Sequence, residues 1–206
     1  MKFSIGDKAV VPSHGVGVIK DIENLTMGGE TWVVYVIKIL DNAMTYKVPV
    51  DMVETNGIRG IMSVDAIDKV YAVLADRDKP ADKQTWNRRY REYMNKIKTG
   101  DPLEVAAVLR DLAILRSEKS LSFGERKMYD QAHGLLVQEI AVARDVDENL
   151  IQDEIEKIFE AADAAANRTR KARPTRKAFE DGFEDEEPEE EEEEASVEEA
   201  SVDDDE

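Results

Sequence analysis

The stretch from Lys83 to Gly100 places a tryptophan, two tyrosines and a dense set of basic residues in one predicted helix. Its only acidic residue is Glu92, and its positive residues are Lys83, Arg88, Arg89, Arg91, Lys96 and Lys98. A local excess of positive charge suits a polyanionic partner. Proteins that bind the minor groove use apolar wedges amid positive charge, because the wedge opens a base step while Arg and Lys neutralise phosphates. This stretch therefore indicates a DNA contact.

The apolar side chains of this helix share one face, because they follow i, i+4, i+7 and i+11 spacing: Trp86, Tyr90, Tyr93 and Ile97. Such spacing is also typical of a buried core stripe, so periodicity alone leaves both interpretations of Trp86 open. Two features favour its exposure. Trp86 lies in the first turn of the helix, and three arginines follow it closely. We expect Trp86 to reach DNA and the other three side chains to pack in the core.

No catalytic constellation is present. The chain has no cysteine, and its two histidines, His14 and His133, lie far apart in sequence, which argues against disulfides and Cys/His zinc sites. Gly15-Val16-Gly17 lacks the third glycine of a dinucleotide-binding loop and precedes β-type sequence, so we interpret it as a turn. We interpret His14 as a polar turn residue and His133 as a helix-surface or packing residue. We expect no enzymatic activity, no cofactor and no bound metal.

The net charge of -18 comes from the C-terminal end of the chain. Residues 180–206 contain 18 acids and no Lys or Arg, so the rest of the chain carries 46 - 18 = 28 acids against 28 bases. The body is therefore neutral and the acidity belongs to an appendage. The N-terminus lacks the apolar core of a signal peptide, and no run approaches the roughly 20 apolar residues that span a membrane. We expect a soluble, cytoplasmic protein without membrane contact.

Short β-rich runs occupy residues 5–60, separated by turn residues: Lys8–Val11, Val16–Ile22, Thr31–Leu40 and Met44–Val50. Sequential short strands favour a small antiparallel barrel or a strongly bent sheet. The run from Trp32 to Ile39 alternates weakly between apolar and polar residues. It therefore predicts either a strand covered on both faces or one with an exposed apolar side.

From Ile61 the apolar period becomes helical, and start signals for five helices follow: Ser63, the Asp82 or Thr85 region, Asp101-Pro102-Leu103-Glu104, Ser122-Phe123-Gly124-Glu125 and Asp147. Gly100 should end the basic helix. The predicted class is α+β, with a β domain over 1–60, a five-helix domain over 61–166 and a disordered tail over 167–206. The tail is basic first and acidic afterwards, with too little apolar content to fold.

The basic part of the tail is a second candidate for contact with DNA. Residues 167–177 contain six positive side chains and no acid: Arg168, Arg170, Lys171, Arg173, Arg176 and Lys177. Lys171-Ala172-Arg173-Pro174 is faintly similar to an AT-hook core. Ala172 stands where the hook has Gly, and its methyl group would crowd the floor of the minor groove.

Several segments in correct order and spacing resemble the CarD/CdnL family of bacterial transcription regulators, over about Phe3 to Ala161. The segments are Gly6-Asp7, Val11 to Gly17, Met44 to Val50, Gly57-Ile58-Arg59, Trp86 to Tyr90 and Leu121 to Glu125. The resemblance implies a Tudor-like N-terminal domain, shared with the transcription-repair coupling factor, that docks on the RNA polymerase β subunit. It also implies a helical domain that places a tryptophan in the minor groove at the upstream edge of the promoter bubble and so stabilises the open complex.

The resemblance assigns roles to individual residues by motif match. Trp86 would be the wedge, and Arg88, Arg89 and Arg91 would contact the DNA backbone. Lys47 falls where the family has a basic polymerase contact, and Met44 and Pro49 of the same motif are further polymerase-binding candidates. Leu25 stands where some members carry a second basic polymerase contact, so this chain departs from their pattern there.

Two functions are compatible with these features. In the first, the β domain tethers a monomeric protein to polymerase, which raises the effective concentration of a weakly binding, largely sequence-independent DNA helix at the promoter. Trp86 then favours the open state by binding it better than the closed state. The alternative is an architectural or adaptor protein that binds DNA through its basic tail segment.

Overall fold

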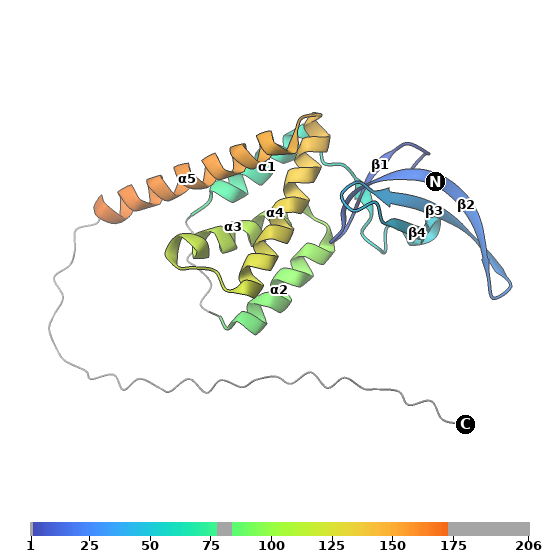
Figure 1. The fold of residues 1–206 in the computed structure, drawn as a ribbon, viewed down its shortest axis with the longest axis horizontal. Coiled ribbons are helices and arrows are strands. Elements are labelled where there is room, and N and C mark those ends of the chain that lie inside the picture. The colour runs from blue at the N-terminus through green and yellow to red at the C-terminus, as the bar shows by residue number, and fades with distance from the viewer. Residues whose placement is uncertain (1, 78–83, 173–206) are drawn as a thin grey trace, which may run out of the picture. The chain divides into compact units, whose positions relative to one another are not determined.

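The computed structural model describes residues 2–77 and 84–172, which form an antiparallel sheet followed by five helices (Figure 1). The strands are β1 (Lys8–Val11), β2 (Gly15–Met27), β3 (Glu30–Ile39), β4 (Thr45–Pro49) and β5 (Arg59–Gly60), and a short 3-10 helix, η1 (Val50–Met52), follows β4. Their order in the sheet is β4-β3-β2-β1-β5. The predicted α+β class is confirmed, but the sheet stays open, with β4 and β5 at its two edges.

The sheet is built around the long β2–β3 hairpin. Gly28 and Gly29 turn the chain with φ values of 62° and 89°, in the left-handed region that glycine adopts without strain. A register shift between Ile19 and Asp21 interrupts the pairing of the two strands, and such bulges bend a sheet. The bent sheet covers its own core, which contains Phe3, Ala9, Val11, Ile19, Tyr35, Ile37 and Ile39.

The two interpretations of the β3 sequence apply to different parts of the strand. Four consecutive residues, Val34 to Ile37, are buried, so this half of β3 is covered on both faces. Trp32 and Val33, which lie nearer the hairpin tip, are exposed. The difference arises because β4 pairs with β3 only from Val34 onward, which leaves the tip of the hairpin without a neighbouring strand on that side.

The five helices are α1 (Val64–Ala75), α2 (Trp86–Thr99), α3 (Pro102–Glu118), α4 (Phe123–Arg144) and α5 (Glu148–Ala172). The predicted caps of α3 and α4 are confirmed. The Asp101 side chain accepts a hydrogen bond from the Leu103 amide at 2.9 Å, and Ser122 and Glu125 form a reciprocal capping box. Gly100 ends α2 in the left-handed conformation, with φ 72°.

Helix α3 lies at the centre of the helical part and is buried around most of its circumference; its buried residues include Val105, Ala106, Val108, Leu109, Leu112 and Ala113. Tyr93 and Ile97 of α2 join this core, as predicted. The prediction for Tyr90 is wrong, because its side chain is 43% exposed. The core covers only part of the apolar face of α2: Trp86, one turn earlier, packs against it, whereas Tyr90 lies outside the covered part.

Helix α5 runs to Ala172, beyond the end predicted at Ala166. The added turns continue an alanine-rich sequence of high helix propensity. An ion pair between Arg77 Nε and Asp163 Oδ1, at 2.8 Å, joins the turn of α5 before the added residues to the end of α1. The acidic run predicted over 180–206 lies outside the described residues. Among the residues that are described, no helix is long and apolar enough to cross a membrane.

Candidate nucleic-acid interface

Trp86 is the first residue of α2, and its side chain is half-buried against the helical core. The indole lies 5.5 Å from the Tyr90 ring, measured between ring centroids, with a tilt of 58° between the planes. One turn of helix separates the two residues, which brings both rings to the same end of α2. An aromatic surface therefore lies at the start of the basic helix, in part exposed and in part supported by the core.

Gly124, in the first turn of α4, gives the Trp86 ring its space. A Cβ atom placed on Gly124 would lie 2.9 Å from Cζ2 and 3.1 Å from Cε2 of the indole. Such distances are shorter than side-chain carbons tolerate, so any side chain at this position would displace the ring. The backbone of Gly124 is helical, and the requirement for glycine is therefore one of space rather than of conformation.

Arg89 supports Trp86 from inside the protein. Its side chain is buried, with the residue 6% exposed, and its Nη2 lies 2.6 Å from Glu125 Oε1. The guanidinium carbon also lies 5.8 Å from the centre of the Trp86 ring. The expectation that Arg89 contacts the DNA backbone does not fit this position, because the residue faces α4 and not solvent. It is better described as a residue that holds Trp86 in place.

Glu125 links this support to the start of α4. Its Oε2 accepts hydrogen bonds from the backbone amide and the hydroxyl of Ser122, both at 2.9 Å. Burial raises the pKa of Glu125, but the hydrogen bonds from Ser122 and Arg89 outweigh burial and leave the pKa below its ordinary value. Glu125 therefore stays ionised at neutral pH and keeps Arg89 beside the indole.

The free positive charge at this end of α2 comes from Arg88 and Arg91, which are exposed. Arg88 makes only a long contact with Glu92, 3.4 Å between Nε and Oε1, on the solvent side of the helix. Lys96 and Lys98 lie nearer the C-terminal end of α2. Lys83 lies outside the described residues. Of the three arginines named by motif match, the structure therefore leaves Arg88 and Arg91 open to a phosphate.

Phe123 is an exposed aromatic residue that the sequence indicated only as part of a capping motif. Its side chain is 85% exposed, and it precedes Gly124, which touches Trp86. The signal available in the sequence was its position at the start of a helix, outside the apolar stripe of Met128, Ala132, Leu136 and Ile140. Trp86, Tyr90 and Phe123 thus lie on two helices whose N-terminal ends meet.

The polymerase-binding candidates lie on the sheet and not beside Trp86. Lys47 is on the edge strand β4, where its Nζ lies 2.6 Å from Glu23 Oε2 of β2, and both side chains are well exposed. Met44 is exposed just before β4, and Pro49 at its end is half-buried. Leu25 is half-buried and pairs with Trp32 near the hairpin tip. This surface therefore presents Lys47 beside apolar side chains, and the exposed Lys38 of β3 pairs with Thr45 next to them.

The two histidines take part in aromatic contacts. His14 Nδ1 lies 2.9 Å from the Tyr46 hydroxyl, and the His133 ring stacks on Tyr129 with 5.9 Å between centroids. Burial lowers the pKa of His133. Within the described residues, no group of three or more His, Asp or Glu side chains is arranged to hold a metal ion.

Comparison with known proteins identifies the two parts of the chain. Residues 3–62 match the CarD-like/TRCF RID domain, and residues 69–156 match the CarD C-terminal domain. A Bacillus subtilis (strain 168) protein named "Putative transcription factor YdeB" is 34% identical over 154 residues, which cover 73% of this chain and 97% of the relative. The chain belongs to the CarD-like transcription factor family. The CarD matches end at residue 156, so the basic and acidic segments that follow lie outside them.

We expect Gly124→Ala to displace Trp86, because the added methyl group would overlap the indole. Overpacking of this kind costs about 1–3 kcal/mol of unfolding free energy. Tryptophan fluorescence in a Trp32→Phe background should shift to longer wavelength as the ring becomes more exposed. Gly134→Ala in the same helix is the matched control, since nothing lies within 4 Å of the added Cβ. An unchanged spectrum in Gly124→Ala would show that the ring does not depend on this space.

Proposed function

We propose that this protein regulates transcription initiation by binding the RNA polymerase β subunit through its sheet and stabilising the open promoter complex with Trp86. The proposal rests on family membership and on one observation in the site. The indole of Trp86 is held by Gly124 and Arg89 on its inner side and is in part exposed beside two unburied arginines. A rigid aromatic edge flanked by positive charge fits the minor groove of DNA that is beginning to melt.

Trp86 acts through differential binding. Insertion of an aromatic ring into a base step costs unstacking energy, and that cost is lowest where the step is already opening. The ring therefore binds the melted upstream edge better than closed duplex, and this difference shifts the equilibrium towards the open complex. Because Gly124 and Arg89 preset the ring position, little conformational freedom is lost on binding. The exposed ring of Phe123 extends the same surface.

Arg88 and Arg91 supply the phosphate contacts. Two or so contacts give only weak, salt-sensitive affinity, since each neutralised phosphate changes the logarithm of the binding constant by about 0.9 per decade of salt. Contacts with phosphates carry no sequence information, so little sequence specificity follows from these two arginines. Such a helix needs a tether to act at promoters.

The sheet supplies the tether. Strand β4 is an edge strand, so one side of its backbone is not paired within the sheet. An exposed sheet edge can accept a strand from a partner, and neighbouring side chains then set specificity. Lys47 and Met44 flank this edge. Linked binding through the sheet raises the local concentration of the α2 tip near the promoter, so a small DNA contact suffices.

Trp86→Ala should shorten the lifetime of the open complex about tenfold relative to the unsubstituted protein, because aromatic stacking on a base contributes ~1–3 kcal/mol. The measurement is the decay of heparin-challenged open complexes on a promoter with purified polymerase. Trp86→Phe should keep part of the effect. A chain ended after Ala172, which retains all of α5, should keep most of it. An unchanged lifetime with a folded Trp86→Ala protein would remove the wedge from the mechanism.

The three arginines of α2 should separate into two classes. Arg88→Gln and Arg91→Gln should each reduce the slope of log affinity against log salt by about 0.9, measured on a duplex with a premelted bubble. Arg89→Gln should instead lower the free energy of unfolding by about 3 kcal/mol, measured by urea titration, because it leaves the buried carboxylate of Glu125 without its charged partner. Lys157→Gln, an exposed substitution on α5, should change neither. If Arg89→Gln is as stable as the unsubstituted protein and reduces the slope of log affinity against log salt, then Arg89 contacts DNA and does not only support Trp86.

Lys47→Glu should weaken polymerase binding about tenfold while the helical part stays folded, because it reverses the basic charge on the proposed docking edge. Surface plasmon resonance with immobilised polymerase measures the affinity, and circular dichroism checks the helices. Lys69→Glu makes the same charge change on α1 and is the control. Lys47→Gln separates loss of the charge from repulsion between two acids at Glu23. Equal affinities for all three would exclude Lys47 from the interface.

A further inference from the structure

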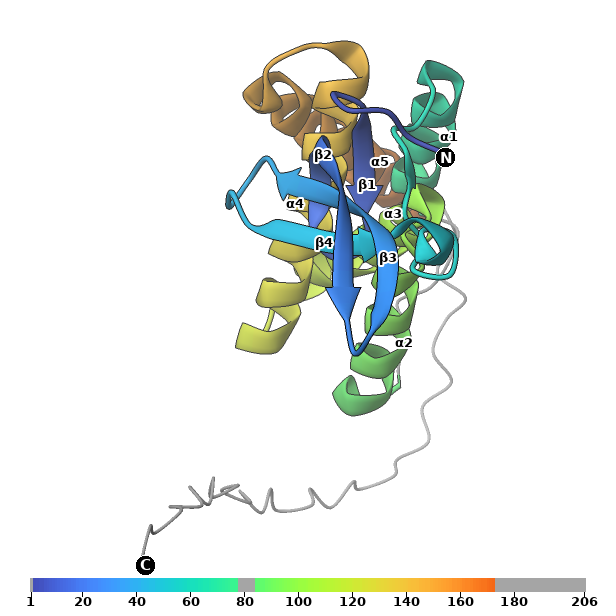
Figure 2. The ribbon, with the colours of Figure 1, turned by 90° about the vertical axis from the view of Figure 1, so that its right-hand side faces the viewer.

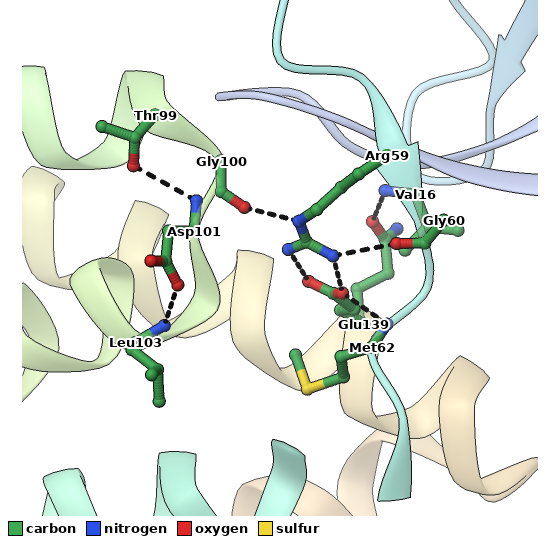
Figure 3. Close-up of polar contacts among 10 residues, drawn as sticks. Val16, Arg59, Gly60, Met62, Thr99, Gly100, Asp101, Leu103 and Glu139 are labelled. Atoms are coloured by element: carbon green, nitrogen blue, oxygen red, sulfur yellow. Dashed lines mark hydrogen bonds and ion pairs between the residues drawn. The ribbon is translucent and has the colours of Figure 1, made fainter. Parts of the chain in front are cut away.

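A network of directional bonds joins the sheet to the helices at Arg59 (Figure 3). Arg59, in β5, makes a forked contact with Glu139 of α4, with Nη1 to Oε1 at 2.5 Å and Nη2 to Oε2 at 2.9 Å. Glu139 is 4% exposed, and its Oε1 also accepts the Met62 amide at 3.0 Å. The Glu139 carboxylate is therefore withdrawn from water, while the Arg59 side chain stays 27% exposed, at the point where the chain passes from the sheet to the helices.

The same arginine reaches the helix that carries Trp86. Arg59 Nε donates to the backbone carbonyl of Gly100 at 2.8 Å, and Gly100 is the C-terminal cap of α2. Gly100 also packs against Pro12 of the β1–β2 turn, since an added Cβ would lie 2.9 Å from Pro12 Cγ. A neighbouring bond strengthens the junction, from the Val16 amide to Gln138 Oε1 at 2.7 Å. The sheet therefore contacts α2 at its C-terminal end.

The proposed DNA contact lies at the opposite end of α2. The helix has 14 residues, so Trp86 is about 20 Å from the junction at 1.5 Å per residue. A rotation of about 10° at Gly100 would therefore move the indole by about 3–4 Å. Functional groups need to be held within about 0.5 Å of their working position by the structure behind them. The direction of α2 relative to the sheet has to be fixed at the junction.

We infer that Arg59 and Glu139 are positioning residues that fix the direction of the Trp86 helix relative to the polymerase-binding sheet. This inference rests on the proposed function, because direction matters only if both surfaces are engaged at once. Cohesion alone does not explain the pair, since apolar residues of similar volume hold two parts together as well as a buried ion pair does. A guanidinium that bonds a carboxylate and a carbonyl at the same time fixes geometry.

Spin labels measure the geometry directly, without polymerase or DNA. The chain has no cysteine, so Lys20→Cys on β2 and Asn95→Cys on α2 introduce two unique labelling sites on exposed residues. Pulsed electron resonance should give one narrow distance distribution for this protein. Arg59→Gln and Glu139→Gln should each broaden it. Arg59→Lys, which keeps the charge but not the fork, should give an intermediate width. A narrow distribution in both glutamine variants would overturn the inference.

Arg144→Gln is the matched control. Arg144 is about as exposed as Arg59 and makes an equally short ion pair, 2.5 Å to Glu154 Oε2, but the pair lies wholly within the helical part. Its variant should keep the narrow distribution. Circular dichroism reports whether each variant is folded. If Glu139→Gln does not fold, Gln138→Leu takes its place, because it disrupts the junction less and removes only the hydrogen bond to Val16.

The functional arm uses unlabelled full-length protein in the open-complex assay. Arg59→Gln and Glu139→Gln should keep polymerase affinity within about twofold and reduce the gain in open-complex lifetime about tenfold, since the advantage of linked binding depends on geometry that lets both sites engage. A broadened distance with an unchanged lifetime gain would overturn the positioning role. If Trp86→Ala also leaves the lifetime unchanged, the proposed function fails, and the distance distributions alone then decide whether the junction fixes the geometry.

Discussion

The ion pair between Arg59 and the buried Glu139 joins the sheet to the helices and, on our proposal, fixes how the two lie relative to each other. It joins a sheet formed by the first third of the chain to a helix formed much later, and it also holds the end of α2 through Gly100. A buried carboxylate has to be fully paired to be tolerated, and Glu139 is paired with Arg59 and the Met62 amide. Figure 2 shows the sheet in front of the helices to which this pair joins it.

The same physical device recurs at the other end of α2. Glu125, which is 2% exposed, pairs with Arg89 and with Ser122, and through Arg89 it supports the ring of Trp86. Both carboxylates belong to α4, so one helix anchors the two ends of another. Helix α4 can do this because its capping box and its apolar stripe fix its own start and its own position in the core. The contacts of Glu125 and Gly124 in α4 therefore set the position of Trp86 at the N-terminal end of α2.

The roles that we propose for the sheet and for the tip of α2 follow from this arrangement. An exposed sheet edge suits a protein partner, because backbone groups on one side of β4 remain available for pairing. A tip with few positive charges and exposed rings suits nucleic acid only weakly when it acts alone. Membership of the CarD-like transcription factor family places both surfaces in a protein of transcription. A weak contact held at a set distance and direction from a stronger one gains affinity without any new interaction.

The sequence by itself determined the elements and their limits, because these depend on local interactions. The capping residues Asp101 and Ser122, the stop at Gly100 and the change from β-type to helical periodicity near Ile61 all act within a few residues. The aromatic and basic character of α2 was visible for the same reason. Local signals also located β1 to β4, although β2 extends further than they indicated, but they did not predict the two-residue strand β5.

Only the tertiary structure decided which side of α2 meets protein and which meets solvent. Spacing placed Trp86, Tyr90 and Tyr93 on one face, but the core covers only part of that face, so Tyr90 is exposed. Arg89 and Arg91 look alike in sequence, and only the approach of Glu125 from another helix makes one of them internal. The Arg59–Glu139 contact joins residues far apart in the chain. Periodicity defines a face, whereas long-range packing decides what that face touches.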